Sequence, residues 1–453
     1  MNYALHTIAG DTTTPIALFA NLTGQKVLFE SSAKHEESGR YSFIARNPLY
    51  SVTGENLTTT IAHRDGTTET KAQHIIDYAK ATLPKIKGDF PFPFFGGAIG
   101  YIGYETIFSY EAIGEKLPAS NELADAHLLF FDSFIVFDHR QETITFVATA
   151  LEPRSEEALQ QVITELMTQA LSAKPLPAAT PSLNFAPSMQ PEQFKTLVDE
   201  AKQAIIAGEV FQVVLSQKFT ANFTGDAFSL YRKLRTANPS PYMFYLDFGH
   251  AIVLGTSPES LVKVSGSAVI TNPIAGTRPR GATAAEDAML EKELLADEKE
   301  LAEHKMLIDL SRNDVGKISN IGTVQVSRYA QIEKYQHVMH IVSEVRGELL
   351  PQLHPLDALM ACLPAGTVSG APKVRAMQLI NELEQDRRGV YAGAVGYISV
   401  TGAMDFALAI RTMVIQNGVA SVQAGAGIVY DSDAQKEYEE TLHKAKALLE
   451  VVR

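Results

Sequence analysis

The chain has 453 residues, of which 45% are apolar and 20% are charged, and its formal net charge is -13. This length suffices for about two or three ordinary domains or one large intertwined one, and the composition is that of a globular protein rather than a disordered one. The acidic balance argues against a general nucleic-acid binder, whereas an anionic small substrate needs only a local cationic site.

The sequence predicts a cytoplasmic protein. Cys362 is the single cysteine, so no disulfide can form within the chain, which suits a reducing compartment. The segment Met1–His6 lacks the basic stretch and apolar run of a signal peptide. The longest apolar stretch, residues 128–137, is interrupted by Asp132 and is far shorter than the roughly 18 residues that a membrane helix needs.

The first part of the chain is predicted to be rich in strands, at residues 26–30, 41–45 and 128–137. A glycine-rich run at 96–104 resembles a nucleotide loop, but no helix pattern follows it, so close strand packing is the better interpretation. Residues 170–191 are rich in Ala, Pro and Ser and indicate a linker. We therefore expect three parts, which are still compatible with one shared core: residues 1–170, a linker at 171–191, and residues 192–453.

The second part is predicted to carry long helices, at residues 284–312 and 433–452, and three strands, at residues 393–400, 404–415 and 419–430. In the last helix, apolar side chains recur every three or four residues and mark a buried stripe: Tyr438, Leu442, Ala445, Leu449 and Val452. The turn signals Thr401-Gly402 and Asn417-Gly418 predict antiparallel hairpins. Hairpins with flanking helices indicate an α+β fold, with mixed sheets and helices outside.

Two pairs of glutamates lie on the predicted helices. Glu300 with Glu303, and Glu437 with Glu440, are spaced three residues apart, so each pair points from one helical face. Two carboxylate pairs brought together repel unless a cation lies between them. Magnesium is the natural candidate, because it takes oxygen ligands and often bridges a few carboxylates and an anionic substrate. The alternative is two solvated helix faces.

Two further segments are candidates for binding an anion. Arg411 lies in the apolar run Ala407–Ile415, where its charge needs a partner, either a structural carboxylate or the carboxylate of a substrate. Gly425-Ala426-Gly427 ends a predicted strand with small residues, which lets backbone N–H groups approach an anion. This segment lacks the third glycine and the following helix of a dinucleotide fingerprint.

Three side chains have both an ordinary and a functional interpretation. Thr367 lies in Gly366–Lys373, before a predicted helix that runs to about Glu384; this loop fails the phosphate-loop pattern and is either a helix cap or a polar loop facing an anion. His340, in an apolar strand, is a core residue or a catalyst. Glu259, beside Pro258, is a turn residue or a general acid.

Several motifs occur together in a fixed order. They are Pro273–Arg278, Glu303-His304 leading into Asp309–Asp314, the Thr367 loop, Tyr391 with Gly393, Arg411, Gly425-Ala426-Gly427 and Glu437–Glu440. In this arrangement the chain resembles the chorismate-utilising enzymes, most closely their anthranilate synthase component I branch. The resemblance is specific over about residues 195–450 and weaker over the first 150. It implies two large, mainly antiparallel sheets packed face to face, with helices on both outer sides.

The resemblance implies an enzyme that makes anthranilate and pyruvate from chorismate and ammonia. It implies a magnesium ion held by Glu303 and Glu440, with Glu300 and Glu437 helping through waters. It also implies that chorismate is held by a further set of residues: Gly276, Thr277, Tyr391, Arg411, Gly425, Ala426 and Gly427.

The resemblance further implies that Glu259 protonates the departing C4 hydroxyl, with Thr367 nearby, and that His340 assists the later loss of pyruvate. These roles agree with elementary chemistry. Chorismate has two carboxylates, one of which can neutralise Arg411 while the other completes the magnesium shell. Hydroxide is a poor leaving group, so its displacement requires a positioned acid whose pKa is raised by its surroundings.

Single residues distinguish the branches of this family. Relatives that add water carry a lysine base where this chain has Gln212, and relatives that aminate at C4 carry a nucleophilic lysine where it has Ala275. Glutamine cannot take a proton from water and alanine has no nucleophile, so amination at C2 is favoured. The alternatives are an aminodeoxychorismate synthase component I and a non-catalytic regulator that binds chorismate or tryptophan.

The resemblance also implies two partners. Cys362 is followed by Leu363-Pro364 and lacks the glycine-tight elbow of a nucleophile, so a separate glutamine amidotransferase subunit is expected to supply ammonia. Leu28–Ser31 and Asn238–Met243 resemble elements for feedback by L-tryptophan, with Phe29 where the family has leucine. The implied inhibitor site comprises Ser31, Pro241, Tyr242 and Met243. The ordinary alternative is a strand and a turn stiffened by prolines.

Overall fold

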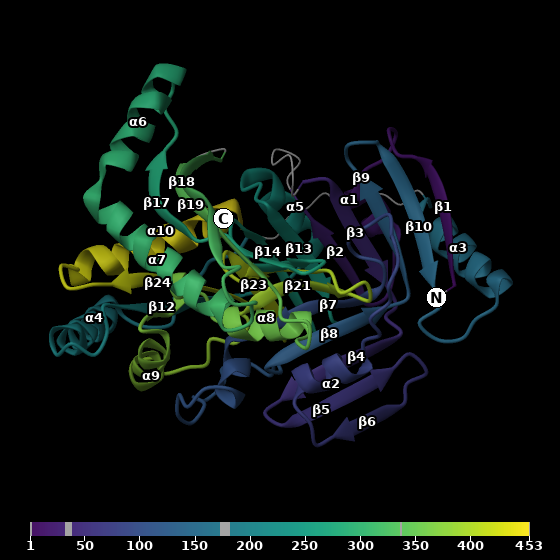
Figure 1. Ribbon diagram of the computed structural model, residues 1–453, viewed down its shortest axis with the longest axis horizontal. Helices are drawn as coiled ribbons and strands as arrows, with labels where there is room; N and C mark the ends of the chain where they lie inside the picture. The colour runs from purple at the N-terminus through teal and green to yellow at the C-terminus, as the bar shows by residue number, and fades with distance from the viewer. Residues whose placement is uncertain (1, 32–38, 173–181, 336–337, 453) are drawn as a thin grey trace.

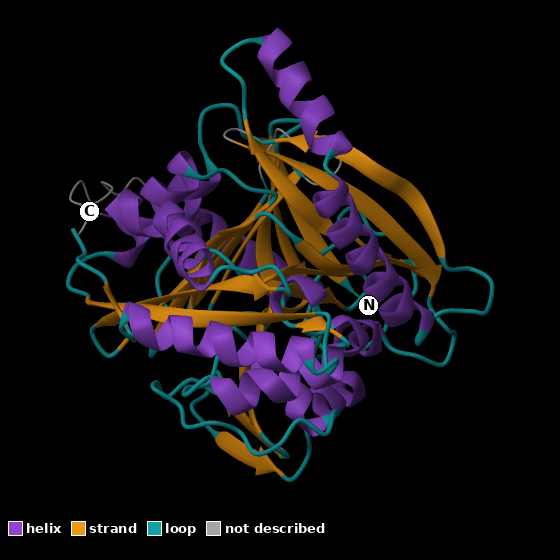
Figure 2. Ribbon diagram, turned by 90° about the vertical axis from the view of Figure 1, so that its left-hand side faces the viewer, coloured by secondary structure: helices purple, strands orange, loops and turns teal. Residues whose placement is uncertain are grey.

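The computed structural model describes residues 2–31, 39–172, 182–335 and 338–452. Its described strands form two large sheets, and within each sheet every pair of neighbouring strands is antiparallel. Helices lie outside the sheets (Figure 2). The predicted α+β fold is therefore confirmed. No helix in this part of the chain is long and apolar enough to cross a membrane.

The first sheet, sheet A, is built from twelve strands. From edge to edge they are β1 (Tyr3–Ala9), β10 (Thr143–Thr149), β9 (Ser133–Asp138), β3 (Tyr41–Arg46), β2 (Lys26–Glu30), β13 (Tyr242–Asp247), β14 (Ala251–Ser257), β23 (Thr412–Gln416), β24 (Val419–Ile428), β12 (Gln212–Asn222) and β11 (Ala186–Pro187), while β20 (Gly370–Ala371) also pairs with β12.

The second sheet, sheet B, also has twelve strands. They are β17 (Ile274–Pro279), β19 (Val338–Glu348), β16 (Ala268–Thr271), β15 (Ser260–Ser265), β22 (Met404–Leu408), β21 (Ala394–Ser399), β7 (Gly97–Ile102), β8 (Ala126–Phe131), β4 (Tyr50–Glu55), β5 (Thr58–His63) and β6 (Thr68–Lys71), while β18 (Gln325–Lys334) also pairs with β19.

The helices surround these sheets. They are α1 (Pro15–Asn21), α2 (Ile75–Thr82), α3 (Glu156–Ala170), α4 (Pro191–Ile206), α5 (Ala227–Ala237), α6 (Ala284–Ala296), α7 (Glu298–Gly316), α8 (Pro355–Cys362), α9 (Lys373–Leu383) and α10 (Ala434–Leu449), with short 3-10 turns η1 (Tyr104–Ser109), η2 (Gly366–Val368) and η3 (Glu450–Val452). In both views α6 extends away from the rest of the molecule (Figures 1 and 2).

The core between the sheets is rich in aromatic side chains. Phe43 and Phe244 of sheet A and Tyr101 and Tyr397 of sheet B belong to one buried cluster. The Phe43 and Tyr397 rings meet edge to face, with centroids 5.5 Å apart. Two other clusters lie under the outer helices. Burial of these side chains removes apolar surface from water and holds the layers together.

Both parts of the chain contribute to both sheets. In sheet A, β2 pairs with β13, so that Phe29 lies opposite Phe244. In sheet B, β7 pairs with β21, where a methyl group added at Gly97 would lie 2.3 Å from the Ile398 carbonyl oxygen. Most of the glycine-rich run at 96–104 thus forms the close-packed strand β7, as predicted, and its last residue, Tyr104, begins η1. Part of the predicted linker, residues 173–181, lies outside the described residues.

Two segments, each predicted to be one strand, form two strands in the structure. Residues 128–137 form β8 in sheet B and β9 in sheet A, divided at Asp132, and residues 404–415 form β22 in sheet B and β23 in sheet A. A continuous apolar run is compatible with one long strand or with two strands in different sheets, because the chain stays buried while it passes between the sheets.

The predicted helix at 284–312 is also wrong in extent. It is two helices, α6 and α7, which meet at Asp297. The Asp297 carboxylate accepts hydrogen bonds from the backbone N–H groups of Lys299 and Glu300, at 3.1 and 3.2 Å, and so begins the second helix as an N-cap. The predicted Asn417-Gly418 hairpin is confirmed, with positive φ at both residues and Gln416 opposite Val419.

Candidate active site

The candidate site lies where two neighbouring connections cross between the sheets. Pro258-Glu259 leads from β14 in sheet A to β15 in sheet B, and Ala409–Arg411 leads from β22 back to β23. The strands pair on both sides of these crossings, through Gly255 with Thr412 and Ser260 with Ala407. The two connections therefore run side by side.

Hydrogen bonds join the two crossings directly. The Leu408 N–H donates to the Glu259 carbonyl at 3.0 Å, and the Thr256 N–H donates to the Arg411 carbonyl at 3.1 Å. The Ser257 hydroxyl donates to the Leu408 carbonyl at 2.7 Å. These bonds fix the backbone on which Glu259 and Arg411 are carried.

Glu259 is a buried carboxyl group with a raised pKa. The Thr367 hydroxyl donates a hydrogen bond to its Oε1 atom at 2.9 Å. Burial raises the pKa to about 7, and the Thr367 bond and the charges of Lys444 and Arg411 limit the rise. The group is therefore protonated in a large fraction of molecules at neutral pH and can act as a general acid. Because Thr367 occupies Oε1, the proton belongs on Oε2.

Arg411 lies at a crossing and not inside a strand, with a left-handed φ of 49°. Among residues 2–31, 39–172, 182–335 and 338–452, no carboxylate lies within 4.0 Å of its guanidinium, although the side chain is half-buried. Burial lowers its pKa. Of the two interpretations of Arg411, a structural ion pair is thus not found in this part of the chain, and the guanidinium is available to an anionic ligand.

His340 lies on β19 with its tautomer fixed. Its Nδ1 atom lies 2.9 Å from the Gly276 carbonyl oxygen, which can only accept, and 3.1 Å from the Thr277 hydroxyl. Nδ1 therefore carries the proton, and Nε2 has a free lone pair in the neutral ring. Burial lowers the pKa of His340. At neutral pH the ring is mostly uncharged and can accept a proton at Nε2.

Gly276 forms a bulge in β17. The pairing of β17 with β19 shifts between Ala275 and Thr277, and Gly276 has a φ of 65°. A methyl group at this position would lie 3.2 Å from the Glu300 carboxylate. The bulge thus brings Gly276, Thr277 and His340 beside α7, which carries the first glutamate pair.

The strand β24 brings Gly425, Ala426 and Gly427 to the site. The hairpin partner β23 pairs only with Val419–Val422, so the later part of β24 extends beyond it. A methyl group at Gly425 would lie 2.8 Å from the Tyr391 hydroxyl oxygen, and one at Gly427 would lie 2.4 Å from Gln212 Nε2. Small residues are therefore required for these close approaches.

The four predicted metal ligands come from two helices, α7 and α10. Burial raises the pKa of Glu303, and the carboxylates of Glu300 and Glu440 raise it further. The pKa of Glu437 is raised by burial and then by Glu440. The structure thus brings the two pairs close enough for their charges to interact, because each helix presents its pair on one face.

Basic side chains already neutralise part of this acidic group. Arg278 Nη1 lies 3.3 Å from Glu300, and Lys444 Nζ lies 2.7 Å from Glu440 and 3.0 Å from the Gly425 carbonyl oxygen. Lys444 was not predicted, although its position four residues after Glu440 on the same helix was a usable signal. It joins the glutamate helix to the glycine strand.

The donor set suits magnesium in one coordination mode. No group of three or more His, Cys, Asp or Glu side chains in the described ranges is placed to surround a metal. Magnesium, however, commonly binds through one or two carboxylates and takes its other ligands from water and an anionic substrate. Carboxylate oxygens that repel one another and are only partly neutralised fit that mode.

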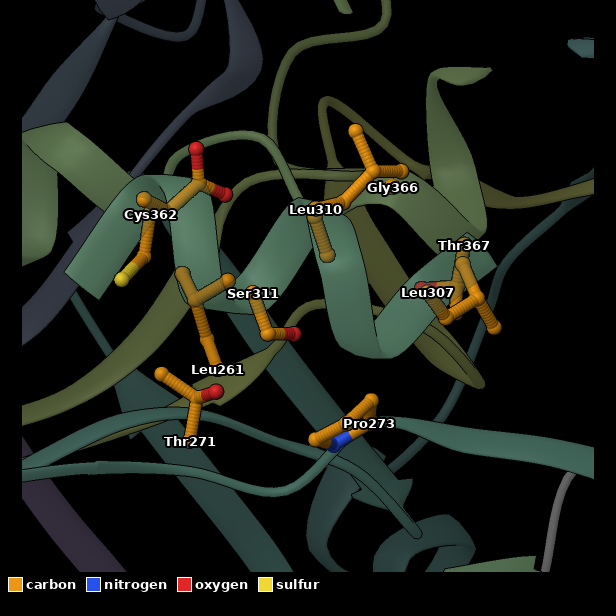
Figure 3. A pocket seen from close by; sticks show the side chains of 11 residues that line it. Leu261, Thr271, Pro273, Leu307, Leu310, Ser311, Cys362, Gly366 and Thr367 are labelled. Carbon is orange, nitrogen blue, oxygen red and sulfur yellow. The ribbon is translucent and has the colours of Figure 1, made fainter. Parts of the chain in front are cut away.

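A pocket lies behind Thr367, between α7, the end of α8, η2 and the strands β15 and β16 (Figure 3). The side chains of Leu261, Thr271, Ser311 and Pro273 face the same space in this view. Thr367 lines the pocket and also bonds to Glu259, so the pocket adjoins the buried acid.

The residues predicted to bind tryptophan lie together at the β2–β13 pair. Ser31 follows β2, Pro241 precedes β13, and Met243 lies opposite Glu30. Tyr242 lies opposite Ser257, and its hydroxyl donates to Asp405 of β22 at 2.9 Å. This cluster therefore touches both strands that lead into the crossings. Residues 32–38, which follow Ser31, lie outside the described residues.

The chain is similar to known proteins over nearly its whole length. The family model described as chorismate binding enzyme matches residues 24–450. The anthranilate synthase component 1 of Lactococcus lactis is 44% identical over 98% of this chain and 98% of its own, and that of Aquifex aeolicus is 43% identical over 98% and 92%.

The solved structure of anthranilate synthase component I from Streptococcus pneumoniae superposes with a TM-score of 0.84 at 44% identity, covering 98% of both chains. The menaquinone-specific isochorismate synthase of Escherichia coli, at 21% identity and a TM-score of 0.76, shares the fold. The chain belongs to the family of chorismate-binding enzymes.

Proposed function

We propose that this protein is an anthranilate synthase component I, which converts chorismate and ammonia to anthranilate and pyruvate. One observation carries the proposal: a buried acid with a pKa of about 7 lies on the crossing beside an arginine that has no carboxylate partner in the described part of the chain. The chain is also 44% identical to a component 1 over nearly its whole length.

Arg411 binds one carboxylate of chorismate, and the backbone at Gly425–Gly427 and the hydroxyls of Tyr391 and Thr277 orient the ring. Glu303 and Glu440 would hold a magnesium ion, with Glu300 and Glu437 acting through waters. When bound, the ion supplies charge neutralisation for the second carboxylate and a template for the ring.

The first step requires an acid. As the nitrogen of ammonia bonds to C2, the ring double bonds shift and the C4–O bond breaks. Glu259 Oε2 gives its proton to the departing hydroxyl, which leaves as water. The ammonium group formed at C2 then loses one proton to solvent and becomes an amine, and Glu259 takes a proton back from solvent. Thr367 holds Oε1 at 2.9 Å and so directs Oε2.

The second step requires a base. His340 Nε2 takes the proton from C2, the bond from C3 to the enolpyruvyl oxygen breaks, and the ring becomes aromatic. The enolate that leaves gains a proton and becomes pyruvate. The bond from Nδ1 to the Gly276 carbonyl keeps Nε2 free for this transfer.

The residues at two positions support amination at C2. Gln212 donates to Glu303 at 3.5 Å and has no basic group to activate water. Ala275 has no nucleophile for covalent amination at C4. The protein with chorismate, ammonium and magnesium is expected to release anthranilate, measured by its fluorescence and by mass, and EDTA is expected to stop the reaction.

Two results would oppose the proposal. Formation of 4-amino-4-deoxychorismate without anthranilate would assign the chain to aminodeoxychorismate synthesis. Chorismate binding without consumption, unaffected by EDTA, would identify a non-catalytic regulator.

We propose that a glutamine amidotransferase subunit supplies the ammonia in the cytoplasm. Cys362 is buried, which raises the pKa of its thiol to about 12, so it is unsuited to glutamine hydrolysis. Glutamine is expected to support turnover only with that subunit present, whereas ammonium supports it without. Turnover of glutamine by this chain alone would contradict the proposal.

L-tryptophan is proposed to inhibit from the cluster of Ser31, Pro241, Tyr242 and Met243. Tyr242 contacts Asp405 on the strand leading to Arg411 and lies opposite Ser257, so a ligand here acts on both crossings. By reciprocity, chorismate then weakens tryptophan binding by the same factor. Equal tryptophan affinity with and without saturating chorismate, or full activity at saturating tryptophan, would oppose this site.

A further inference from the structure

Arg388 lies at the centre of a buried network beneath the candidate site. Its side chain is only 1% exposed. Its Nη2 and Nε atoms donate to the two carboxylate oxygens of Glu384, at 2.6 and 2.9 Å. This bidentate pair is enclosed by the protein, so Arg388 itself has no access to a substrate.

The same guanidinium also holds two backbone segments. Nη1 donates to the Val368 carbonyl at 2.6 Å, and Nη2 donates to the Val214 carbonyl at 2.8 Å. Val368 directly follows Thr367, whose hydroxyl bonds to Glu259. Val214 lies on β12, two residues after Gln212. Arg388 therefore joins the loop of the proposed acid to the strand beneath the glutamates.

Two aromatic rings enclose the guanidinium. The Tyr104 and Tyr391 ring centroids lie 5.0 and 5.6 Å from its central carbon. The Tyr391 hydroxyl is the group that lies against Gly425. Arg388 thus lies against the ring of the residue whose hydroxyl approaches the glycine strand.

Glu384 extends the network to the glycine strand. It accepts from the N–H and hydroxyl of Ser216, at 2.9 and 2.8 Å, and the Ser216 hydroxyl accepts from Gln423 at 2.8 Å. Gln423 lies two residues before Gly425. One ion pair therefore contacts the segments that carry Thr367, Tyr391 and the glycines.

We propose that Arg388 is a positioning residue, which fixes Thr367, and through it the Glu259 carboxyl, together with Tyr391 against the bound ring. The inference rests on the proposed function. A planar fork of five donors can hold a carboxylate and two carbonyls at once, whereas the three donors of a lysine on a flexible stem cannot reproduce that geometry. Charge alone is therefore not sufficient at this position.

The test compares Arg388→Lys and the double variant Arg388→Met with Glu384→Gln against the wild-type enzyme. The double variant removes both charges, so no buried carboxylate is left without its partner. Folding is checked by circular dichroism and thermal unfolding. Both variants are expected to lower kcat about a hundredfold, with a smaller change in KM for chorismate.

A second readout separates positioning from general weakening of the fold. Loss of the Thr367 bond to Glu259 leaves burial, Lys444 and Arg411 as the remaining influences on that carboxyl. In a plot of kcat against pH, kcat is expected to fall at high pH, where Glu259 loses its proton. Loss of the Thr367 bond raises the pKa of Glu259, so this falling limb is expected to move to higher pH, as in the variant Thr367→Val. Weakening of the fold alone leaves the limb in place.

The neighbouring Arg387 provides the matched control. Its Nε atom donates to the Leu117 carbonyl at 2.6 Å and its Nη1 atom pairs with Glu55 at 3.0 Å, away from the network. Arg387→Lys and Arg387→Met are expected to keep wild-type kcat and its pH profile.

A folded double variant with wild-type kcat and pH profile would overturn the proposal. If both Arg388 variants fail to fold, Tyr104→Leu, which removes one enclosing ring, replaces them and is expected to shift the same limb; an unchanged limb then overturns it. If the wild-type enzyme makes a different product from chorismate, the proposed function fails, while the ratio of variant to wild-type rates still tests the positioning role.

Discussion

At Glu259, burial and two nearby cations act on one carboxyl group in opposite directions. Burial favours the neutral acid and raises the pKa to about 7, while the Thr367 hydrogen bond, Lys444 and Arg411 favour the carboxylate. A proton donor is effective when its pKa lies near the working pH. The chemistry of the residue is therefore set by its neighbours.

The pH dependence of kcat follows from this balance. In the proposed function Glu259 acts as the protonated acid, so kcat is expected to fall as the pH rises through about 7. In Thr367→Val the hydroxyl that stabilises the carboxylate is removed, so the pKa rises and the falling limb moves to higher pH. Anthranilate formation measured across the pH range checks both. A limb that moves to lower pH would contradict the assignment of Glu259 as the acid.

A second prediction for a single residue concerns Arg411. Arg411→Gln is expected to raise KM for chorismate about 10- to 100-fold, because a charge-assisted bidentate contact is worth about 1.5–3 kcal/mol. The melting temperature of Arg411→Gln should not fall, because no carboxylate in the described ranges forms an ion pair with Arg411. Arg235→Gln is the contrast: it removes the cation paired with the buried Glu30, which keeps the hydrogen bond from the Tyr231 hydroxyl, and is expected to cost about 3–5 kcal/mol of stability. Equal losses of stability would contradict this difference.

At the scale of elements, the crossings decide which residues meet. The paired strands β14 with β23 and β15 with β22 hold the two connections together, and Ser257 links them through the Leu408 carbonyl. Glycines and left-handed residues appear where the chain needs them, as at Gly276 and Arg411. Glu259 and Arg411 thus lie on connections that paired strands position.

Ser257→Ala tests the importance of the link between the crossings. The buried hydroxyl donates to the Leu408 carbonyl, so its loss is expected to cost about 1–3 kcal/mol of stability and to lower kcat about tenfold or more. Ser42→Ala is the matched control, since its buried hydroxyl bonds to His139 outside the site. Denaturant unfolding and steady-state rates are compared for both. A kcat loss in the control as large as in Ser257→Ala would contradict the role of the link.

The sequence predicts individual helices and hairpins better than the contacts between distant elements. Helical spacing places Glu300 with Glu303, and Glu437 with Glu440, and Asn-Gly predicts the β23–β24 hairpin, because these are local patterns. The breaks at Asp132 and Arg411 are not readable, since a buried chain that changes sheet keeps the same apolar pattern. The meeting of Glu259 with Thr367, or of Lys444 with Gly425, depends on the packing of distant strands.

At the scale of the whole molecule, the two sheets are each completed by both parts of the chain. Without residues 1–170, β13 would lose β2 and β21 would lose β7, and the aromatic core between the layers would be exposed. The expected linker at 171–191 therefore does not separate two independent layers of the fold.

Residues 192–453 expressed alone are expected to aggregate or to remain without a cooperative transition, because long unpaired edges and apolar surface are exposed. Co-expression with residues 1–170 is expected to restore solubility. Size-exclusion chromatography and thermal unfolding check the result. A soluble, cooperatively folded fragment would contradict the dependence.

The paired crossings have a thermodynamic consequence. The backbone at Glu259 and at Arg411 is bonded from both sheets before any ligand arrives. A rigid cyclic dicarboxylate therefore meets groups that need little ordering, so little conformational entropy is lost by the protein when the complex forms. Affinity in this architecture comes from preorganisation, and calorimetry of such an inhibitor should record a small entropic penalty.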